Sequence, residues 1–365
     1  MKKIVAYFIM VISAFVLVVC AVDDFTKVLS NLRKTPEALR SWWGSDKYKY
    51  GDLYGFTYLP QFRVAEPVGS EDIVPIAACD SNVRLYNVYG LSDSYTFNVF
   101  KTRISFCGAD KIGFAASNFR DVLPLLMDRS KKNYLIIETV ERNVRSLLAD
   151  SAYLVNFIHP VKENDNLEGL NTAEKRRRFR FDFRLNNREA NYEFNVWDYS
   201  FLTPLKELKA KISYAVFGRS HADATVSPDG KFLLLHSTVD TAFLESSYKP
   251  INDVELAKIV AGLNNAFDVY KRAGFDEIYL SIIPNPTTVL YPTYKQFTYN
   301  NLIPKIQNHP ALKPKVFDCY GLFKHQPNKE KLYRPSDTHW TSTGRDLWLR
   351  TFNQVLVKHM KQPRY

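Results

Sequence analysis

Apolar residues recur with two different periods along this chain, and the alternation of the two predicts an α/β fold. Short runs rich in β-branched and aromatic residues are typical of buried strands, and they occur at 84–90, 134–138, 277–283 and 315–318. Apolar residues repeated every three or four positions indicate helices over 253–272 and 344–359. Helices alternating with short strands favour a three-layer α/β/α sandwich with a mostly parallel sheet.

Shorter patterns predict four further elements. They indicate helices at 97–104 and 121–127, a helical stretch around 297–306, and a strand at 231–235 after the turn Ser227-Pro228-Asp229-Gly230. The chain therefore returns to the sheet several times, with loops between the elements.

One apolar run near the N-terminus is long enough to span a bilayer. It extends from Ile4 to Val22, after two lysines and before two aspartates. A membrane span needs about 20 residues, and this charge distribution places the N-terminus in the cytoplasm. A cleaved signal peptide is one alternative, and a lipoprotein modified at Cys20 is another, although Val19 is larger than the residue such a site requires. We predict an uncleaved single-pass anchor over 1–23 in a bacterial inner membrane, with the rest of the chain extracytoplasmic.

The remaining chain divides by composition. Residues 24–75 are predicted to be a stalk or linker, whose aromatic residues pack on the domain or lie near the membrane interface. The α/β domain is predicted to comprise 76–150 and 213–365. Residues 151–212 interrupt the α/β rhythm and contain the basic run 175–184, so they are predicted to be an insertion.

Charge and cysteine content narrow the possible partners. The net charge of +11 suits an anionic polysaccharide or phospholipid head groups, and predicted export argues against nucleic acid. Outside the anchor lie Cys79, Cys107 and Cys319, of which Cys79 and Cys107 are a possible pair. Neither the cysteines nor the scattered histidines have zinc-ligand spacing, so no metal and no cofactor is predicted.

The strongest candidate chemistry lies near the C-terminus, where Asp337 and His339 flank one residue. In an extended segment both side chains leave the same side of the backbone. An aspartate so placed orients an imidazole by one nitrogen and leaves the other free to accept a proton. The alternative is a helix N-cap at Ser342 or Thr343, with the histidine merely packed nearby.

A matching serine follows the strand at 84–90. Asp93-Ser94 occupies a tight turn between this strand and a predicted helix, where a nucleophile's backbone N–H favours an oxyanion. Helix capping explains the same residues. Ser220 is a second candidate, but the chain after it leaves no room for the helix that should follow a nucleophile turn.

Two other loops follow predicted strands. Arg142 comes shortly after 134–138, where an ion pair with Glu138 is its more ordinary role, and Asn285 and Thr287 follow 277–283. Loops at the carboxyl ends of parallel strands share one edge of the sheet, so these residues are expected to converge with Ser94 and His339.

Several stretches together resemble the alginate O-acetyltransferase group of the SGNH (GDSL-type) hydrolase superfamily. The resemblance covers roughly 80–150 and 215–360, with the serine segment ahead of the Asp-x-His segment, as if permuted. Ser92 stands where that superfamily has the glycine of Gly-Asp-Ser, and Thr287-Thr288 replaces a lysine. The stretches that carry the resemblance are 93–96, 136–142, 227–233, 284–292 and 337–341.

The resemblance implies acyl-ester chemistry on a serine. It implies that Ser94 is the nucleophile, that His339 is its base, and that Asp337 orients the base. The Ser94 N–H and the Asn285 loop would stabilise the oxyanion, and further site residues would be Asp93, Thr287, Trp340 and Arg142. The implied partners are a polysaccharide acceptor and a membrane-bound O-acyltransferase that supplies acetyl. A carbohydrate acetyl-esterase and a non-catalytic polysaccharide-binding or assembly protein are the alternatives.

Overall fold

The computed structural model describes residues 2–64, 85–96, 99, 105–116, 123–149, 151–155, 158–161 and 191–360. The chain forms two compact units. The first comprises Met1–Ser70, Asn171–Leu233 and Pro335–Asp337, and the second comprises Glu71–Leu170, Leu234–Arg334 and Thr338–Tyr365.

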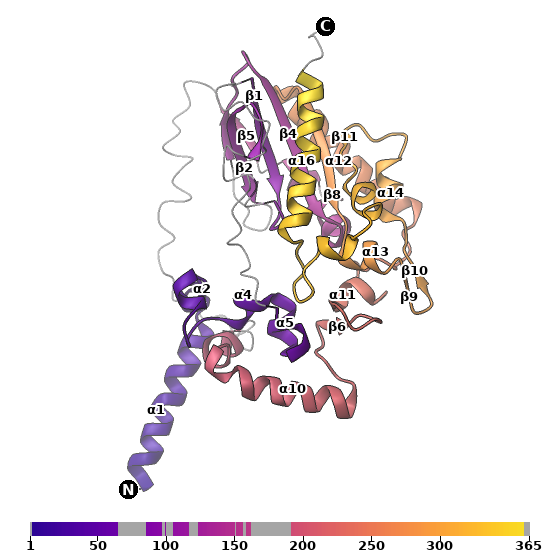
Figure 1. Cartoon of the computed structure of the whole chain (residues 1–365). Helices are drawn as coiled ribbons and strands as arrows, with labels where there is room; N and C mark the ends of the chain where they lie inside the picture. Colours follow the sequence, from indigo (N-terminus) through magenta and orange to yellow (C-terminus); the bar gives the residue numbers. More distant parts are fainter. Residues whose placement is uncertain are drawn as a thin grey trace. The chain divides into compact units, whose positions relative to one another are not determined.

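The second unit is built on a five-stranded sheet in the order β11-β8-β4-β1-β2 (Figure 1). Every pairing in this sheet is parallel, which confirms the predicted α/β class with a mostly parallel sheet. All four strands predicted for this sheet are present. The strands are β1 (Tyr86–Ser92), β2 (Ala109–Ala116), β4 (Lys132–Val140), β8 (Glu277–Ile283) and β11 (Lys315–Val316).

One face of the central strands packs against helix α12 (Asp253–Ala273). Ile278, Leu280 and Ile282 of β8 lie in the same buried cluster as Leu263 of the helix. Helix α12 begins where the Asn252 side chain accepts a hydrogen bond from the Glu255 N–H, at 2.8 Å. The predicted helix at 253–272 is therefore confirmed, with its apolar stripe against the sheet.

The alternate residues of β8 point to the other face, where helix α16 (Ser342–Met360) lies. The rings of Tyr279 and Phe352 are 5.3 Å apart, and Trp348 Nε1 donates a hydrogen bond to Ser281 Oγ at 2.9 Å. Because side chains alternate along a strand, α12 and α16 cover opposite faces of β8. Burial on both faces explains why the middle of each strand is rich in apolar residues, as in Tyr134–Ile137 of β4 and Ile278–Leu280 of β8.

Two of the shorter predictions need correction. The helix predicted at 121–127 is wrong over its described residues, because Leu123–Leu126 (β3) pairs in parallel with Ile158–Val161 (β5), and Pro124 disfavours a helix interior. The stretch 297–306 divides into a short strand, β10 (Phe297–Thr298), paired with β9 (Thr293–Tyr294), and helix α14 (Leu302–Gln307). The strand predicted at 231–235 is β7 (Leu233–Leu235). The predicted helix at 97–104 lies outside the described residues, apart from Val99.

Short helices complete the described part of the second unit. They connect the strands and carry loops at the carboxyl ends of β4 and β8. They are η5 (Glu141–Asn143), α6 (Val144–Leu147), α7 (Ser151–Val155), α11 (His236–Val239), α13 (Pro286–Leu290), α15 (Cys319–Lys324) and η10 (Lys329–Leu332).

The first unit is largely helical in its described part, which includes most of the segment predicted to be a stalk or linker. Residues 23–62 fold together with residues after 190, including helix α10 and strand β6 (Ala224–Val226). The helices are α1 (Lys2–Ala21), α2 (Asp23–Arg33), α3 (Pro36–Leu39), α4 (Asp46–Tyr50), α5 (Asp52–Thr57), η1 (Pro60–Phe62), the π-helical turn η8 (Glu193–Trp197), η9 (Ser200–Leu202) and α10 (Thr203–Phe217).

A buried arginine holds these distant segments together. Arg33 is fully buried and donates hydrogen bonds to the carbonyls of Trp43 and Phe194, at 2.9 and 2.7 Å. Its guanidinium lies over the rings of Phe194 and Tyr199 and is 3.8 Å from the Asp198 carboxylate. The predicted insertion at 151–212 therefore divides differently: its described end belongs to the first unit, and its basic run lies outside the described residues.

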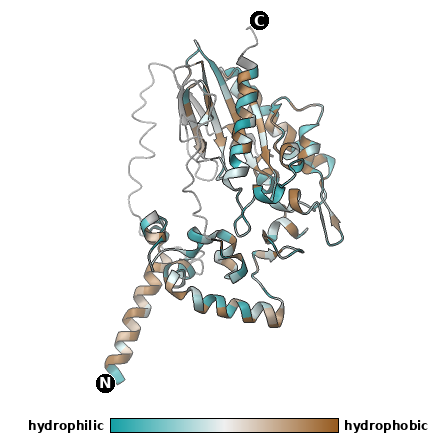
Figure 2. Ribbon diagram, viewed as in Figure 1, coloured by the Kyte–Doolittle hydropathy of each residue, from teal (hydrophilic) through white to brown (hydrophobic). Residues whose placement is uncertain are grey.

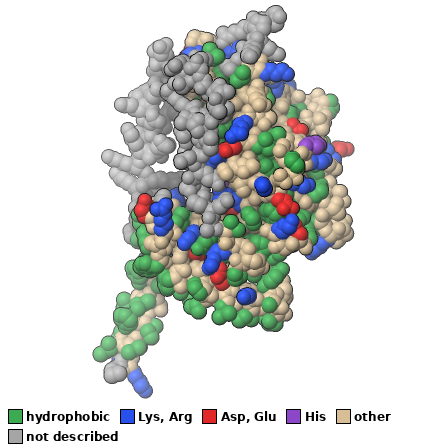
Figure 3. Space-filling model, viewed as in Figure 1, with side chains coloured by type: hydrophobic (Ala, Val, Ile, Leu, Met, Phe, Trp, Pro, Cys, Tyr) green, Lys and Arg blue, Asp and Glu red, His purple; other side chains and the backbone are tan. Residues whose placement is uncertain are grey.

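Helix α1 is the one helix in the described ranges that is long and apolar enough to cross a membrane, a property that signal sequences share. Figure 2 colours it brown, hydrophobic, along most of its length, and Figure 3 shows hydrophobic side chains covering it. Among the cysteines, Cys20 and Cys319 are free and Cys107 is disulfide-bonded. Cys79 lies outside the described residues.

Candidate active site

Ser94 is presented by a tight turn directly after β1. The strand is buried to its end at Ser92, and Asp93 and Tyr95 are also buried, whereas Ser94 between them is exposed. The Asp93 carboxylate accepts a hydrogen bond from the Tyr95 N–H at 2.9 Å, which closes the turn. The turn thus exposes one hydroxyl at the carboxyl edge of the sheet.

Hydrogen bonds from the neighbouring strand β4 hold this turn in place. Glu138 Oε2 accepts hydrogen bonds from the Asp93 N–H, at 3.1 Å, and from the Thr96 hydroxyl. In return, Asp93 Oδ2 accepts the Val140 N–H at 2.7 Å. Burial, together with the nearby charge of Asp93, raises the pKa of Glu138 well above its usual range. The two acids therefore fix the backbone on both sides of Ser94.

His339 reaches Ser94 from the other end of the chain. It lies beside a bridge between Tyr333 and Trp340, and the Arg334 N–H donates to the His339 carbonyl at 3.2 Å. His339 Nε2 is 2.8 Å from Ser94 Oγ, although the two residues are 245 positions apart. Of the predicted site residues, these two are brought into direct hydrogen-bonding contact.

The ring of Tyr95 lies against the imidazole. The Tyr95 ring lies 4.9 Å from that of His339 and 5.3 Å from that of Trp340, and its hydroxyl donates to the Thr338 carbonyl. Arg142 lies over the Tyr95 ring at 5.6 Å, with Nη1 3.5 Å from the hydroxyl. Trp340 and Arg142 therefore support the histidine through Tyr95. The expected ion pair of Arg142 with Glu138 stays a prediction.

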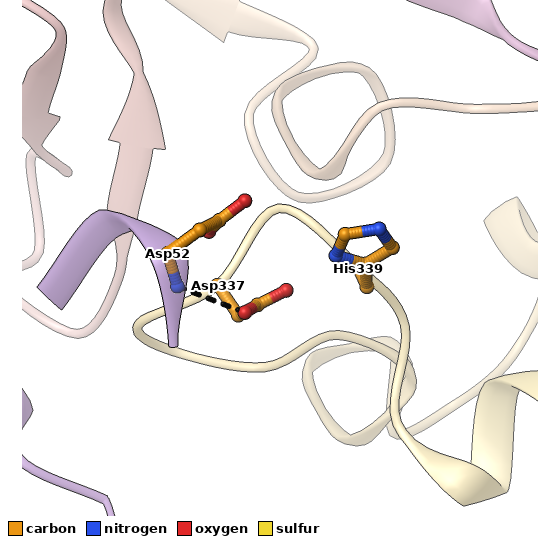
Figure 4. A group of neighbouring side chains, drawn as sticks. All are labelled: Asp52, Asp337 and His339. Carbon is orange, nitrogen blue, oxygen red and sulfur yellow. Dashed lines mark hydrogen bonds between the residues drawn. The ribbon is translucent and has the colours of Figure 1, made fainter. Parts of the chain in front are cut away.

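Asp337 lies two residues before His339 on the same loop and is buried (Figure 4). Its Oδ2 accepts a hydrogen bond from the Asp52 N–H at 2.9 Å, while the Ser336 carbonyl accepts from Leu53 and Tyr54. The start of α5 thus binds this part of the loop through main-chain amides. Orientation of His339 by Asp337 stays a prediction.

The Asn285 loop is built into a buried polar network. Asn285 donates its N–H to Glu141 Oε2 at 3.0 Å and its side-chain amide to Ser247 Oγ at 3.2 Å. The hydroxyls of Thr287 and Ser247 are 3.1 Å apart, and Thr288 donates to Glu141. Asn285 and Thr287 thus hold the loop in place, and their proposed contact with an oxyanion or substrate stays a prediction.

Sequence reasoning missed the centre of this network, Glu141. Burial raises its pKa to about 7, against the opposing effects of the Thr288 and Asn285 hydrogen bonds and the charge of Arg145. A charged residue directly after a buried strand is the signal that could have found it. Nothing in the sequence links it to Ser247.

No protein-family model, no curated protein and no solved structure matches this chain. The resemblance to the alginate O-acetyltransferase group therefore rests on the short motifs alone. The function is inferred from the contact between Ser94 and His339.

Proposed function

We propose that this protein is a membrane-anchored, extracytoplasmic O-acetyltransferase that modifies a cell-envelope or exported polysaccharide through an acetyl-serine intermediate. The observation that carries the proposal is the 2.8 Å contact between Ser94 Oγ and His339 Nε2. A serine with a buried structural role would not be exposed at a strand end, opposite an imidazole from a remote loop. This arrangement matches a nucleophile and its general base.

The chemistry follows the order of proton transfers that this pair allows. His339 takes the Ser94 proton as Oγ attacks the acetyl carbonyl, and the tetrahedral intermediate then expels the donor's alkoxide, which receives the proton from His339. In the second half, His339 deprotonates a sugar hydroxyl, which attacks the acetyl-serine. The tetrahedral intermediate then expels Ser94 Oγ, which takes the proton back from His339. Asp337 stabilises the imidazolium in both halves, and the Ser94 N–H and the Asn285 loop stabilise the oxyanion.

Two structural features support the wider proposal. Helices on opposite faces of β8 support a three-layer SGNH-type sandwich, and α1 supports a single-pass anchor in a bacterial inner membrane with the second unit outside it. A membrane-bound O-acyltransferase is the proposed acetyl donor. The same Ser94–His339 pair serves a carbohydrate acetyl-esterase when water replaces the sugar hydroxyl.

The test compares full-length wild type, Ser94→Ala and Ser220→Ala in detergent with a chromogenic acetyl ester. We expect a burst of acetate release and an acetyl adduct by intact mass in the wild type and in Ser220→Ala. Ser94→Ala should lose the adduct and roughly a thousand-fold in rate. Oligosaccharide acceptors then separate transfer from hydrolysis.

A folded wild-type protein that gives neither release nor adduct would contradict the enzymatic proposal and favour a binding or assembly role. Retained activity in Ser94→Ala would show that another nucleophile is used.

A further inference from the structure

Helix α10 turns an apolar face to solvent. Leu205, Leu208, Ile212 and Val216 are 65%, 57%, 53% and 66% exposed. Their spacing of three and four residues places them on one side of an α-helix. The described residues of the first unit leave this face uncovered.

The opposite, polar face of α10 packs against the first unit. Thr203 and Lys206 donate hydrogen bonds to the buried Asp46 carboxylate at 2.6 and 3.0 Å. Glu207 accepts a hydrogen bond from the Tyr54 hydroxyl at 2.7 Å. A surface helix of a water-soluble domain has the reverse arrangement, with its apolar stripe inward. Helix α10 is therefore suited to an apolar environment outside the protein.

The edges of the apolar face have the composition of a membrane interface. Lys209 and Lys211 are exposed on its two sides. Before the helix, Phe201 is 55% exposed, and its ring lies 5.7 Å from that of Trp42, which is 67% exposed. Lysines flanking an apolar stripe, with tryptophan at one end, characterise helices that lie in the head-group region of a bilayer. Figure 3 shows hydrophobic side chains interspersed with lysine and arginine in the region of α10.

The start of α10 is linked to the end of the candidate membrane helix. Asn191 donates a hydrogen bond to the Cys20 carbonyl at 2.9 Å, and Asn195 donates to the Val19 carbonyl at 3.4 Å. From there η9 leads directly into α10. In Figure 1, α10 runs across the direction of α1. A bilayer crossed by α1 would thus have its surface at the level where α10 begins.

We propose that α10 lies in the outer head-group layer of the phospholipid bilayer that α1 crosses. The apolar face, Leu205, Leu208, Ile212 and Val216, enters the acyl boundary, while Lys209 and Lys211 contact phosphates. Such helices are buried about 5–10 Å into this boundary, and a helix of this length covers about 22 Å of surface. The inference rests on the proposed membrane anchoring and is independent of the chemistry at Ser94.

The experiment uses the full chain in nanodiscs of phosphatidylcholine and phosphatidylglycerol, with or without bromine atoms on the acyl chains, which quench nearby tryptophan. Leu208→Trp and, one turn further, Ile212→Trp report on the apolar face, so that one variant suffices if the other misfolds. Val254→Trp is the matched control, because Val254 is an 81% exposed apolar residue on α12. Wild type supplies the background of the five native tryptophans.

We expect the emission added at position 208 or 212 to fall roughly two-fold in brominated discs, because the ring lies at acyl-chain depth. The emission added at position 254 should stay unchanged. Equal quenching at positions 208, 212 and 254 would overturn the proposal. The absence of quenching at both 208 and 212 would also overturn it, and would indicate that a protein partner covers this face.

Alkaline carbonate extraction of the same full-length protein distinguishes the two failures. A protein that resists extraction but shows no quenching at α10 retains its anchor and refutes only the role of α10. A protein that is released by carbonate lacks the anchor on which the proposal rests.

Discussion

The hydrogen bonds of Glu138 allow a quantitative prediction about the turn that presents Ser94. Glu138→Ala leaves two buried donors, the Asp93 N–H and the Thr96 hydroxyl, without their acceptor. Each buried donor that loses its partner costs about 1–3 kcal/mol. We therefore expect a loss of about 2–6 kcal/mol in the free energy of unfolding of the second unit, and a slower burst of acetate because the Ser94 turn loosens.

Glu138→Gln should behave differently. Its amide oxygen still accepts both hydrogen bonds. We expect a cost below about 1 kcal/mol and a nearly normal burst. The contrast between the two variants separates hydrogen bonding from mere occupation of the site.

The assay is urea unfolding of the full-length protein in non-ionic detergent, followed by tryptophan fluorescence, with Glu277→Ala as the control. Glu277 lies in the same sheet, but its pair with Lys315 is partly exposed, so its removal should cost about 1 kcal/mol at most. If the free energy of unfolding of Glu138→Ala lay within about 1 kcal/mol of the wild-type value, the two hydrogen bonds would not stabilise the turn as proposed. A Glu138→Gln variant as unstable as Glu138→Ala would also contradict the reasoning.

Three further predictions concern other buried groups. Folding raises the pKa of Glu141 from 4.5 to about 7, so the native state binds an extra proton and stability falls as pH rises through that window. Glu141→Gln should remove roughly 3 kcal/mol of that fall, measured by unfolding at pH 4.5 and 8. An unchanged dependence of stability on pH in this variant would contradict the prediction. Gly262→Ala should destabilise α12 by about 1–3 kcal/mol instead of stabilising it, because a Cβ would overlap the Leu148 carbonyl oxygen, and a raised melting temperature would show otherwise. Arg33→Met should lower the free energy of unfolding of the first unit by about 3–5 kcal/mol, since it removes the buried cation that faces the Asp198 carboxylate. Unaltered hydrogen exchange in α2 and η8 would argue against this prediction.

Sequence patterns were sufficient to predict those elements in which the apolar positions match the residues that are buried in the fold. The middle parts of β4 and β8 are mostly apolar because both faces are covered, and α12 has one apolar stripe because one side meets the sheet. The pairing of Ser94 with His339 was also predictable, because the residue types suggested the chemistry.

Tertiary structure decided what depends on contacts between distant segments. The π-helical turn η8 packs with the N-terminal helices because Arg33 needs carbonyl acceptors and a counter-charge. No periodic pattern in the sequence indicates which segment supplies them. β3 forms a strand because β5 supplies its hydrogen bonds, and the Asn285 loop is fixed by Glu141 and Ser247 from two other loops. Local periodicity reports which side of an element is buried, whereas the partner of a buried polar group is chosen only when the chain has folded.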